Sequence, residues 1–299
     1  MSGFMSSSTA MTICKADTSG AFDLDALRTH AFTPDIDADG RRFGWVSLGD
    51  LLDADGFELS SVDGRYSGFS FRLDTRKASG AVIRLQLAEA VREEVASGKK
   101  VGGKRKKELK EAITAKLTAK AEFVPSLIDC LWDAEKGRLL VGSASAKAVQ
   151  PVLDLFKTTF GIDAAPITPA GDMPKLFSAI LRGEGYPCLG YTLHAMGSAS
   201  LAASEQTEEK AAVAVQNSLN AVAQALDDGM AIQKLHLVAT SASEPDWQME
   251  FSLDAALAVS GLRLPKAEKG MDEDATFLLN ADACSQVADM VEVLASAWL

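Results

Sequence analysis

The amino-acid sequence predicts an α+β fold in which a sheet core carries a helical hairpin. Segments with the two-residue period of half-buried strands are mixed with helical segments in no regular strand–helix–strand order. In the first half of the chain, two amphipathic helical patterns follow each other across a glycine-rich break. With 299 residues, 47% of them hydrophobic, the chain can bury a core in one large domain or in two to three small ones.

The first part of the chain predicts three strands and one short helix. We expect a flexible leader through about Ser8, because this segment carries few structural signals. The expected elements are strands at residues 10–15, 43–48 and 66–74, and a helix at 23–32 with acidic residues in its first turn. In the third strand Phe69, Phe71 and Leu73 alternate with other residues and therefore share one face.

The predicted hairpin consists of helices at residues 82–96 and 108–123, joined by the glycine- and lysine-rich residues 97–107. Each helix has an apolar stripe at four-residue spacing. The stripes are Ile83, Leu87, Val91 and Val95 in the first helix, and Leu109, Ile113 and Leu117 in the second. Such a hairpin would project from the surrounding sheet.

The second part of the chain again mixes strands and helices. Its expected elements are paired strands at 127–133 and 138–143, helices at 145–160 and 207–228, strands at 232–240 and 247–253 that can pair with each other, a strand at 276–280, and a last helix at 281–299. Residues 161–187 are rich in proline and glycine and are the best candidate for a domain boundary.

Charge is distributed unevenly along the chain. With 30 Lys and Arg against 41 Asp and Glu, the formal charge of −11 argues against DNA binding, which needs basic residues. Residues 99–120, however, hold nine basic and two acidic side chains, which leaves this window at +7 and the rest of the chain at −18. The nine are Lys99, Lys100, Lys104, Arg105, Lys106, Lys107, Lys110, Lys116 and Lys120. This asymmetry predicts an anion-binding surface, and a merely solubilising hairpin is the alternative.

The lysines of the second predicted helix border its apolar stripe. On a helical wheel Lys110 and Lys116 lie about 60° to either side of the stripe, and Lys120 nearly overlaps it. Lysine can cover an apolar surface with its stem while its ammonium stays in water. The same helix face could therefore serve both packing and binding.

Two segments resemble ligand-binding motifs incompletely. Residues 98–104 (GKKVGGK) match part of a P-loop, but Arg105 stands where Ser or Thr should bind Mg²⁺, and a helix precedes the motif instead of a strand. Residues 35–40 (DIDADG) match the first half of a calcium loop, but Val46 replaces the bidentate Glu. A flexible basic turn and a solvated acidic turn are the better interpretations.

No spacing points to an enzyme. His30, His194 and His236 are scattered, and the only Glu-x-Lys sequence, at Glu108 and Lys110, lies on the basic helix and not on a strand. A nuclease would need clustered carboxylates to hold Mg²⁺. The sequence therefore predicts no enzyme, no metal site and no cofactor.

The remaining composition excludes several classes of protein. No apolar run approaches the ~18 residues of a membrane span, and the N-terminus does not match a secretory signal. The four cysteines, Cys14, Cys130, Cys188 and Cys284, lie far apart and are expected to be buried free thiols. A cytoplasmic protein is expected.

Several segments resemble the RdgC family of recombination-associated proteins. The specific part is the basic hairpin (KKVGGKRKKELKEAITAKL) together with SASAK at residues 143–147. The matching segments are 30–34, 44–46, 99–117, 137–161, 234–237 and 272–294, in the family's order over nearly the whole chain.

The resemblance implies an α+β subunit with a mixed sheet core, a helical-hairpin tip and a C-terminal α+β base domain. The implied domains are a central domain at 1–77 and 126–165, the tip at 78–125 and the base at 166–299. Two subunits would form a ring-shaped homodimer around double-stranded DNA, bind it without sequence preference, and limit the access of RecA. Such a protein would be cytoplasmic and nucleoid-associated.

The resemblance also assigns residues. DNA would be bound by the nine basic residues of the hairpin together with Lys147 and Lys234. The dimer interface would include Leu109, Ile113, Leu117 and Phe123.

The sequence departs from the family at two places. The usual Pro-Arg-Ala-Phe after the second tip helix is replaced by residues 119–122 (AKAE), with Phe123 one step later, and residues 197–206 lack the usual basic residues. One alternative to DNA binding is therefore an interaction dimer that has lost it, and a second is a metal-dependent exonuclease, an activity sometimes attached to the family by name.

Overall fold

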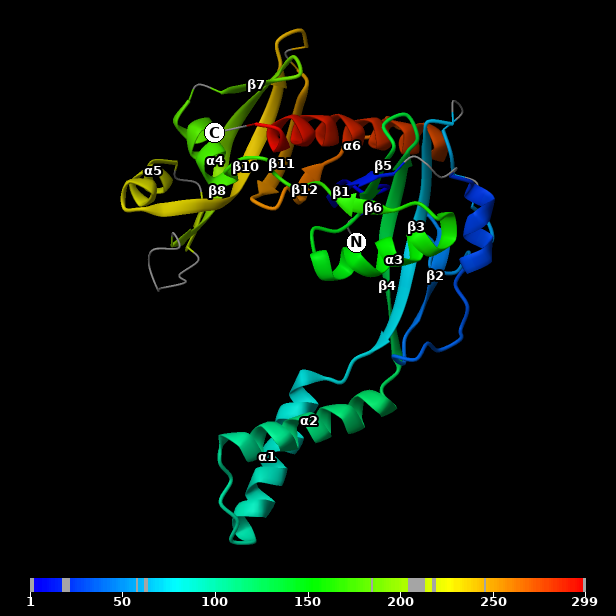
Figure 1. Ribbon diagram of the computed structural model, residues 1–299, viewed down its shortest axis with the longest axis vertical. Coiled ribbons are helices and arrows are strands. Elements are labelled where there is room, and N and C mark those ends of the chain that lie inside the picture. The colour runs from blue at the N-terminus through cyan, green and yellow to red at the C-terminus, as the bar shows by residue number, and fades with distance from the viewer. Residues whose placement is uncertain are drawn as a thin grey trace. The chain divides into compact units, whose positions relative to one another are not determined.

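The chain folds into two compact units, seen in the computed structural model of Figure 1. Unit 1 comprises Met1–Ala31, Trp45–Phe71 and Ile128–Leu299, and unit 2 comprises Phe32–Gly44 and Arg72–Leu127. The structure describes residues 3–17, 22–57, 59–61, 64–183, 185–203, 213–216, 219–244 and 246–297. Among these residues, no helix combines the length and the apolar character that crossing a membrane requires.

The α+β class is confirmed. The helices are η1 (Leu24–His30), α1 (Gly80–Ala96), α2 (Gly103–Lys120), α3 (Ala146–Phe160), α4 (Met173–Arg182), α5 (Leu219–Asp227) and α6 (Glu273–Ala295). The strands are β1 (Ser8–Ala16), β2 (Arg42–Ser47), β3 (Tyr66–Arg76), β4 (Phe123–Asp133), β5 (Arg138–Val141), β6 (Ala164–Pro166), β7 (Tyr186–Cys188), β8 (Tyr191–Ala203), β9 (Val213–Gln216), β10 (Met230–Ser241), β11 (Gln248–Asp254) and β12 (Val259–Arg263).

The strands pair in the order β2-β3-β4-β5-β1-β12-β11-β10-β8-β7, with β6 also on β1 and β9 also on β8. All strand pairs of described register are antiparallel, whereas a mixed sheet was expected. Short turns between consecutive strands such as β4 and β5 favour this arrangement, because antiparallel neighbours need no crossover. The predicted strand pairs β4–β5 and β10–β11 are confirmed.

Strand β1 connects the two halves of the sheet. Its first part, from Ser8 to Met11, pairs with β12, and its second part, from Thr12 to Lys15, pairs with β5. The pairing register with β12 shifts between Thr9 and Met11. One strand near the start of the chain therefore joins segments that lie more than 100 residues later in the sequence.

The expected flexible leader is wrong for the described residues from Gly3 onward. The Phe4 side chain is only 1% exposed and belongs to the main core. Its N–H donates to a carboxylate oxygen of Asp129 (3.0 Å), and its carbonyl accepts from the side-chain amide of Asn280 (2.8 Å). Burial raises the pKa of Asp129. Gly3 is needed beside this carboxylate, because a Cβ there would lie 2.3 Å from an Asp129 oxygen.

The expected strand at 276–280 is also wrong, because these residues lie inside helix α6. The side chain of Asp272 accepts a hydrogen bond from the N–H of Ala275 (2.8 Å) and caps the helix, with Glu273 and Asp274 in the first turn. Buried residues recur every three or four positions from Phe277 to Ala295, which is the period of a helix covering a core. The short apolar run TFLLN is ambiguous when it is read alone.

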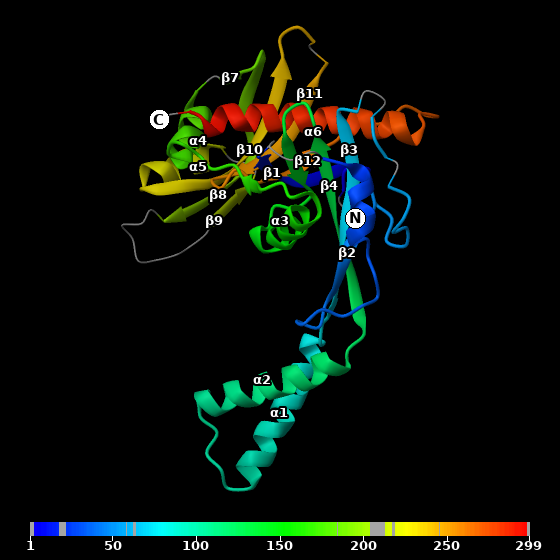
Figure 2. The same ribbon diagram turned by 45° about the vertical axis from the view of Figure 1, so that its right-hand side comes forward.

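Helix α6 spans unit 1 from β3 to β7 (Figures 1 and 2). Near its start Phe277 lies against Gly68 of β3, where a Cβ would approach the ring to 2.7 Å. Near its end the carbonyl of Met290 accepts from the thiol of Cys188 in β7 (3.7 Å). This single helix therefore covers strands from both halves of the sheet.

Other expected elements change their length or type. The helix expected at 207–228 is confirmed only as α5 (Leu219–Asp227); Val213–Gln216 form strand β9, and residues 204–212 and 217–218 lie outside the described residues. The second hairpin helix begins at Gly103 and ends at Lys120, so Phe123 belongs to strand β4. The four cysteines are buried free thiols, as expected.

Replacing Phe4 with alanine should lower the free energy of unfolding by about 3–5 kcal/mol, because it empties a core position. Urea denaturation of the full chain measures this. The control is Leu52→Ala, whose side chain is 88% exposed and whose loss should change stability by no more than about 0.5 kcal/mol. Equal losses in the two variants would contradict the placement of Phe4 in the core.

Candidate nucleic-acid interface

The basic segment forms the helical hairpin of unit 2, made by α1 and α2 (residues 80–120). The last turn of α1 is closed by the N–H groups of Ser97, Gly98 and Lys99, which donate to carbonyls of Glu93, Val95 and Glu94 (all 3.0 Å). Gly98 adopts φ of +80°, a conformation that favours glycine. The chain then passes to α2 through residues 99–102.

The N-terminus of α2 is rich in lysine and has no side-chain cap. Gly102 occupies the cap position, and the first turn contains no acidic residue. Lys104, Lys106 and Lys107 lie in the first turns, where positive charge opposes the helix dipole at a cost of about 0.3–1 kcal/mol each. Free N–H groups and lysines together attract an anion. The lysines at this end of α2 therefore lower the stability of the helix, and they would favour the binding of a phosphate group.

Arg105 differs from the neighbouring lysines because its guanidinium is engaged. It donates to Glu94 of α1 at 2.6 Å and pairs with Glu108 at 3.2 Å. These contacts raise the pKa of Arg105, and the hydrogen bond from Arg105 lowers the pKa of the Glu94 carboxyl. Arg105 therefore holds the two helices together, which the sequence pattern did not reveal.

The hairpin lysines keep their charges exposed. The exposed ones are Lys99, Lys100, Lys104, Lys106, Lys107, Lys110, Lys116 and Lys120. Among the described ion pairs, these lysines contribute one, between Lys107 and Glu111, and at 3.9 Å it is loose. The basic side chains are therefore available to a polyanion.

The apolar stripes of the hairpin are only partly covered. Leu109, Ile113 and Leu117 are half-buried where α2 packs on α1, and neither helix has a fully buried residue. Exposure reaches 61% for Leu85 and 58% for Val95. The hairpin thus has apolar surface that its own chain does not cover.

The other assigned residues lie on separate elements. Lys147 is exposed in the first turn of α3, and Lys234 is half-buried in β10 opposite Asp254 of β11. Both belong to unit 1, whereas the hairpin belongs to unit 2. Phe123 begins β4 in unit 2 and is half-buried. None of these placements tests the assigned roles.

The weak motifs resolve into structural turns. The P-loop-like residues 98–104 connect two helices, so the strand that should precede a P-loop is missing there. In the calcium-like loop, Arg41 pairs with Asp37 (3.0 Å) and with Asp39 (2.6 Å) and so offsets part of their negative charge. His236 contacts Ser252.

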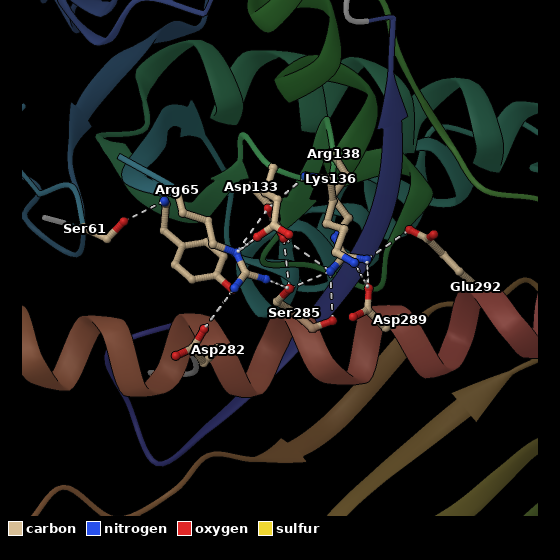
Figure 3. Close-up of polar contacts among 11 residues, drawn as sticks. Ser61, Arg65, Asp133, Lys136, Arg138, Asp282, Ser285, Asp289 and Glu292 are labelled. Carbon is tan, nitrogen blue, oxygen red and sulfur yellow. Dashed lines mark hydrogen bonds and ion pairs between the residues drawn. The ribbon is translucent and has the colours of Figure 1, made fainter. Parts of the chain in front are cut away.

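A buried charge cluster centres on Arg138, and the sequence pattern did not reveal it (Figure 3). Arg138 and Asp133 are completely buried and lie 3.3 Å apart. The guanidinium also donates to Ser285 (2.6 Å), Asp289 (2.8 Å) and Glu292 (3.1 Å), all on α6. The cluster therefore connects the β4–β5 hairpin to one face of α6.

A second arginine extends this cluster. Arg65 pairs with Glu135 at 2.9 Å and lies over the ring of Tyr66 at 4.6 Å. The Tyr66 hydroxyl donates to Asp282 of α6 (2.9 Å), and burial raises its pKa. A lone arginine among apolar residues, as in GRLL at 137–140, indicates a buried arginine that needs a carboxylate partner. The sequence does not show which carboxylate this is.

Arginine fills the centre of this carboxylate cluster. Among the described residues, no group of three or more His, Cys, Asp and Glu side chains is arranged to hold a metal ion. The carboxylates near Arg138 face its guanidinium and accept hydrogen bonds from its two terminal nitrogens. The visible role of the cluster is to attach α6 to the sheet.

The fold and the charge pattern define an α+β protein with a helical hairpin whose lysines are exposed. The chain belongs to the RdgC family: the family's sequence model, described as "Putative exonuclease, RdgC", matches residues 15–293. The family is associated with DNA recombination. A search of curated proteins finds no match to the chain.

Replacing Arg138 with methionine should cost about 3–5 kcal/mol of stability, because Asp133 would stay buried without its partner. Urea denaturation measures the loss. The control is Arg182→Met, which removes an exposed pair with Asp227 and should cost no more than about 1 kcal/mol. If both variants lost the same small amount, the cluster would not be the attachment of α6.

Proposed function

We propose that this protein binds double-stranded DNA without sequence preference through the helical hairpin of unit 2. The observation that carries the proposal is the set of exposed lysines around the uncapped N-terminus of α2, only one of which has an ion pair among the described residues. Lysines at the start of a helix reduce its stability, so stability alone does not account for their position.

The chemistry of these lysines favours phosphate contacts over base reading. A lysine ammonium is a point charge that satisfies a phosphate in many geometries, whereas base reading needs side chains with fixed donor and acceptor patterns. The +7 of residues 99–120 stands in a chain whose remainder carries −18. The rest of the chain therefore repels DNA and confines binding to the hairpin.

We further propose that two copies form a homodimer through their hairpins and close a ring around the duplex. The support is the apolar surface that α1 and α2 leave exposed. Within one chain, no residue of either helix is fully buried. Isolated helices of this length are marginal in water without packing partners. A ring on DNA would limit the access of a RecA-like recombinase and keep the protein at the nucleoid in the cytoplasm.

The family description also names an exonuclease. The described residues show no site for the metal ions that phosphodiester cleavage commonly uses. Incubation of linear duplex with the protein and Mg²⁺ or Mn²⁺ gives the direct test, and shortened DNA would favour the enzyme over the binding protein.

Replacing Lys104, Lys106, Lys107 and Lys110 with glutamine should weaken duplex binding by at least 100-fold at about 0.1 M salt. Each lost phosphate contact removes about 0.9 from the slope of log affinity against log salt, so the slope should become shallower by about 2 to 4. Fluorescence anisotropy with labelled duplexes of two unrelated sequences measures both quantities.

The matched control replaces four lysines of unit 1, namely Lys157, Lys175, Lys266 and Lys269, with glutamine. The net charge changes equally, so affinity and slope should stay close to wild type. Equal weakening in both quadruple variants would show that net charge and not the hairpin decides binding, and wild-type protein that binds no duplex at low salt would overturn the proposal.

Replacing Leu85 with lysine should shift the protein from dimer to monomer, because the charge would have to be buried in the proposed interface. Light scattering after size exclusion, at several protein concentrations, measures the mass. Leu52→Lys on unit 1 is the control and should leave the mass unchanged. The proposed hairpin interface would be contradicted if the Leu85→Lys protein had the mass of a dimer, or if the wild-type protein were a monomer.

A further inference from the structure

Two arginine side chains lie over the ring of Phe123 at the end of the hairpin in unit 2. The guanidinium carbon of Arg42 in β2 is 3.9 Å from the ring centroid, and that of Arg76 in β3 is 4.6 Å from it. Arg76 also donates to the carbonyl of Ala119 in the last turn of α2 (2.8 Å). We call Arg42, Arg76 and Phe123 the arginine–phenylalanine site.

These two arginines have no carboxylate partner among the described ion pairs. This separates them from Arg72, which lies over Phe32 at 3.8 Å but makes two hydrogen bonds to Asp74 (2.7 and 2.8 Å). Both Arg42 and Arg76 are half-buried, and the Nε donor of each is buried without a hydrogen-bond partner in the described structure.

An unpaired, half-buried guanidinium group is unfavourable for the protein alone. A buried donor left unsatisfied costs about 1–3 kcal/mol, and two positive charges over one ring repel each other. A guanidinium stacked on an aromatic ring still presents its edge, whose N–H donors fit the oxygens of a phosphate. One anion at this edge would offset the repulsion between the two guanidinium groups.

The surrounding charge also favours an anion. Lys77 follows Arg76 in the chain, Lys120 follows Ala119, and both lysines are exposed. Two acidic residues lie close to Phe123 or Arg76 in the sequence. Glu122 precedes Phe123, and Asp74 is engaged with Arg72. The positive charge at this end of α2 is therefore greater than its carboxylates neutralise.

We propose that the arginine–phenylalanine site binds a phosphodiester of the DNA backbone. The proposal rests on the duplex binding proposed above and adds a contact beyond the lysine window. Helix α2 has 18 residues and is thus about 27 Å long, which corresponds to about eight base pairs of duplex. The lysines at its start and the two arginines at its end would contact separate phosphates.

The test is the double variant Arg42→Gln with Arg76→Gln, compared with wild type in anisotropy titrations. The probe is a 30-base-pair duplex without terminal phosphates, so that only backbone phosphodiesters can bind. At about 0.1 M salt, affinity should fall by about tenfold for one lost contact, and the salt slope should become shallower by about 1. Near-UV circular dichroism checks that the double variant is folded.

A second variant, Arg42→Lys with Arg76→Lys, keeps both charges and removes the planar donors. It should bind more weakly than wild type, because lysine cannot reproduce the stacked, two-donor contact. Arg182→Gln with Arg263→Gln removes two charges in unit 1, serves as the charge control for the double glutamine variant, and should bind like wild type. Inorganic phosphate as competitor should weaken wild-type binding more than it weakens the double glutamine variant.

The outcomes separate this inference from the proposed function. If the hairpin lysine variants lose affinity while both arginine double variants keep wild-type affinity and slope, the arginine–phenylalanine site is overturned and the hairpin remains. If Arg42→Lys with Arg76→Lys binds like wild type and only Arg42→Gln with Arg76→Gln binds more weakly, then positive charge alone explains the binding. A site that depends on stacked guanidinium groups would be overturned. If wild type binds no duplex, both proposals fall together.

Discussion

The architecture of unit 1 depends on one buried ion pair, that of Arg138 with Asp133. Two fully buried charges lose their hydration, and this loss is offset by the hydrogen bonds that the pair makes with its surroundings. Ser285, Asp289 and Glu292 of α6 accept hydrogen bonds from the two terminal nitrogens of Arg138. Only one register of α6 along the sheet brings these three side chains to Arg138, so the pair specifies the position of the helix. The N-terminal segment adds a second attachment, because Asn280 of α6 holds the carbonyl of Phe4.

The hairpin of unit 2, in contrast to unit 1, does not depend on buried side chains. It has no fully buried residue, its strongest internal contact is the pair of Arg105 with Glu94, and its lysines remain exposed. Such a structure gives up stability and leaves charged and apolar surface exposed. Unit 1 thus buries a core, whereas the hairpin of unit 2 keeps its side chains at the surface.

Arginine and lysine also have different roles in this chain. Arg138 and Arg72 pair with carboxylates inside the fold, and Arg105 pairs with Glu94 on the surface of the hairpin. The hairpin lysines are mostly without ion pairs among the described residues. Arg42 and Arg76 depart from the pattern, since they stack on Phe123 and have no carboxylate partner among the described ion pairs. The exposed and unpaired positive charge therefore gathers at the start of α2, along it and at its end.

The sequence by itself determined the α+β class, the two hairpin helices, the β4–β5 and β10–β11 pairs and the RdgC family, because these depend on local periodicity, turns and motif order. Only the tertiary structure decided that TFLLN is helical, that Phe4 belongs to the core, that Arg105 is a clamp and that Arg138 is buried. Each of these depends on partners far away in the chain, such as Asn280 for Phe4 and α6 for Arg138. A short apolar run or a single arginine has the same local pattern in either environment, and burial among distant residues chooses between them.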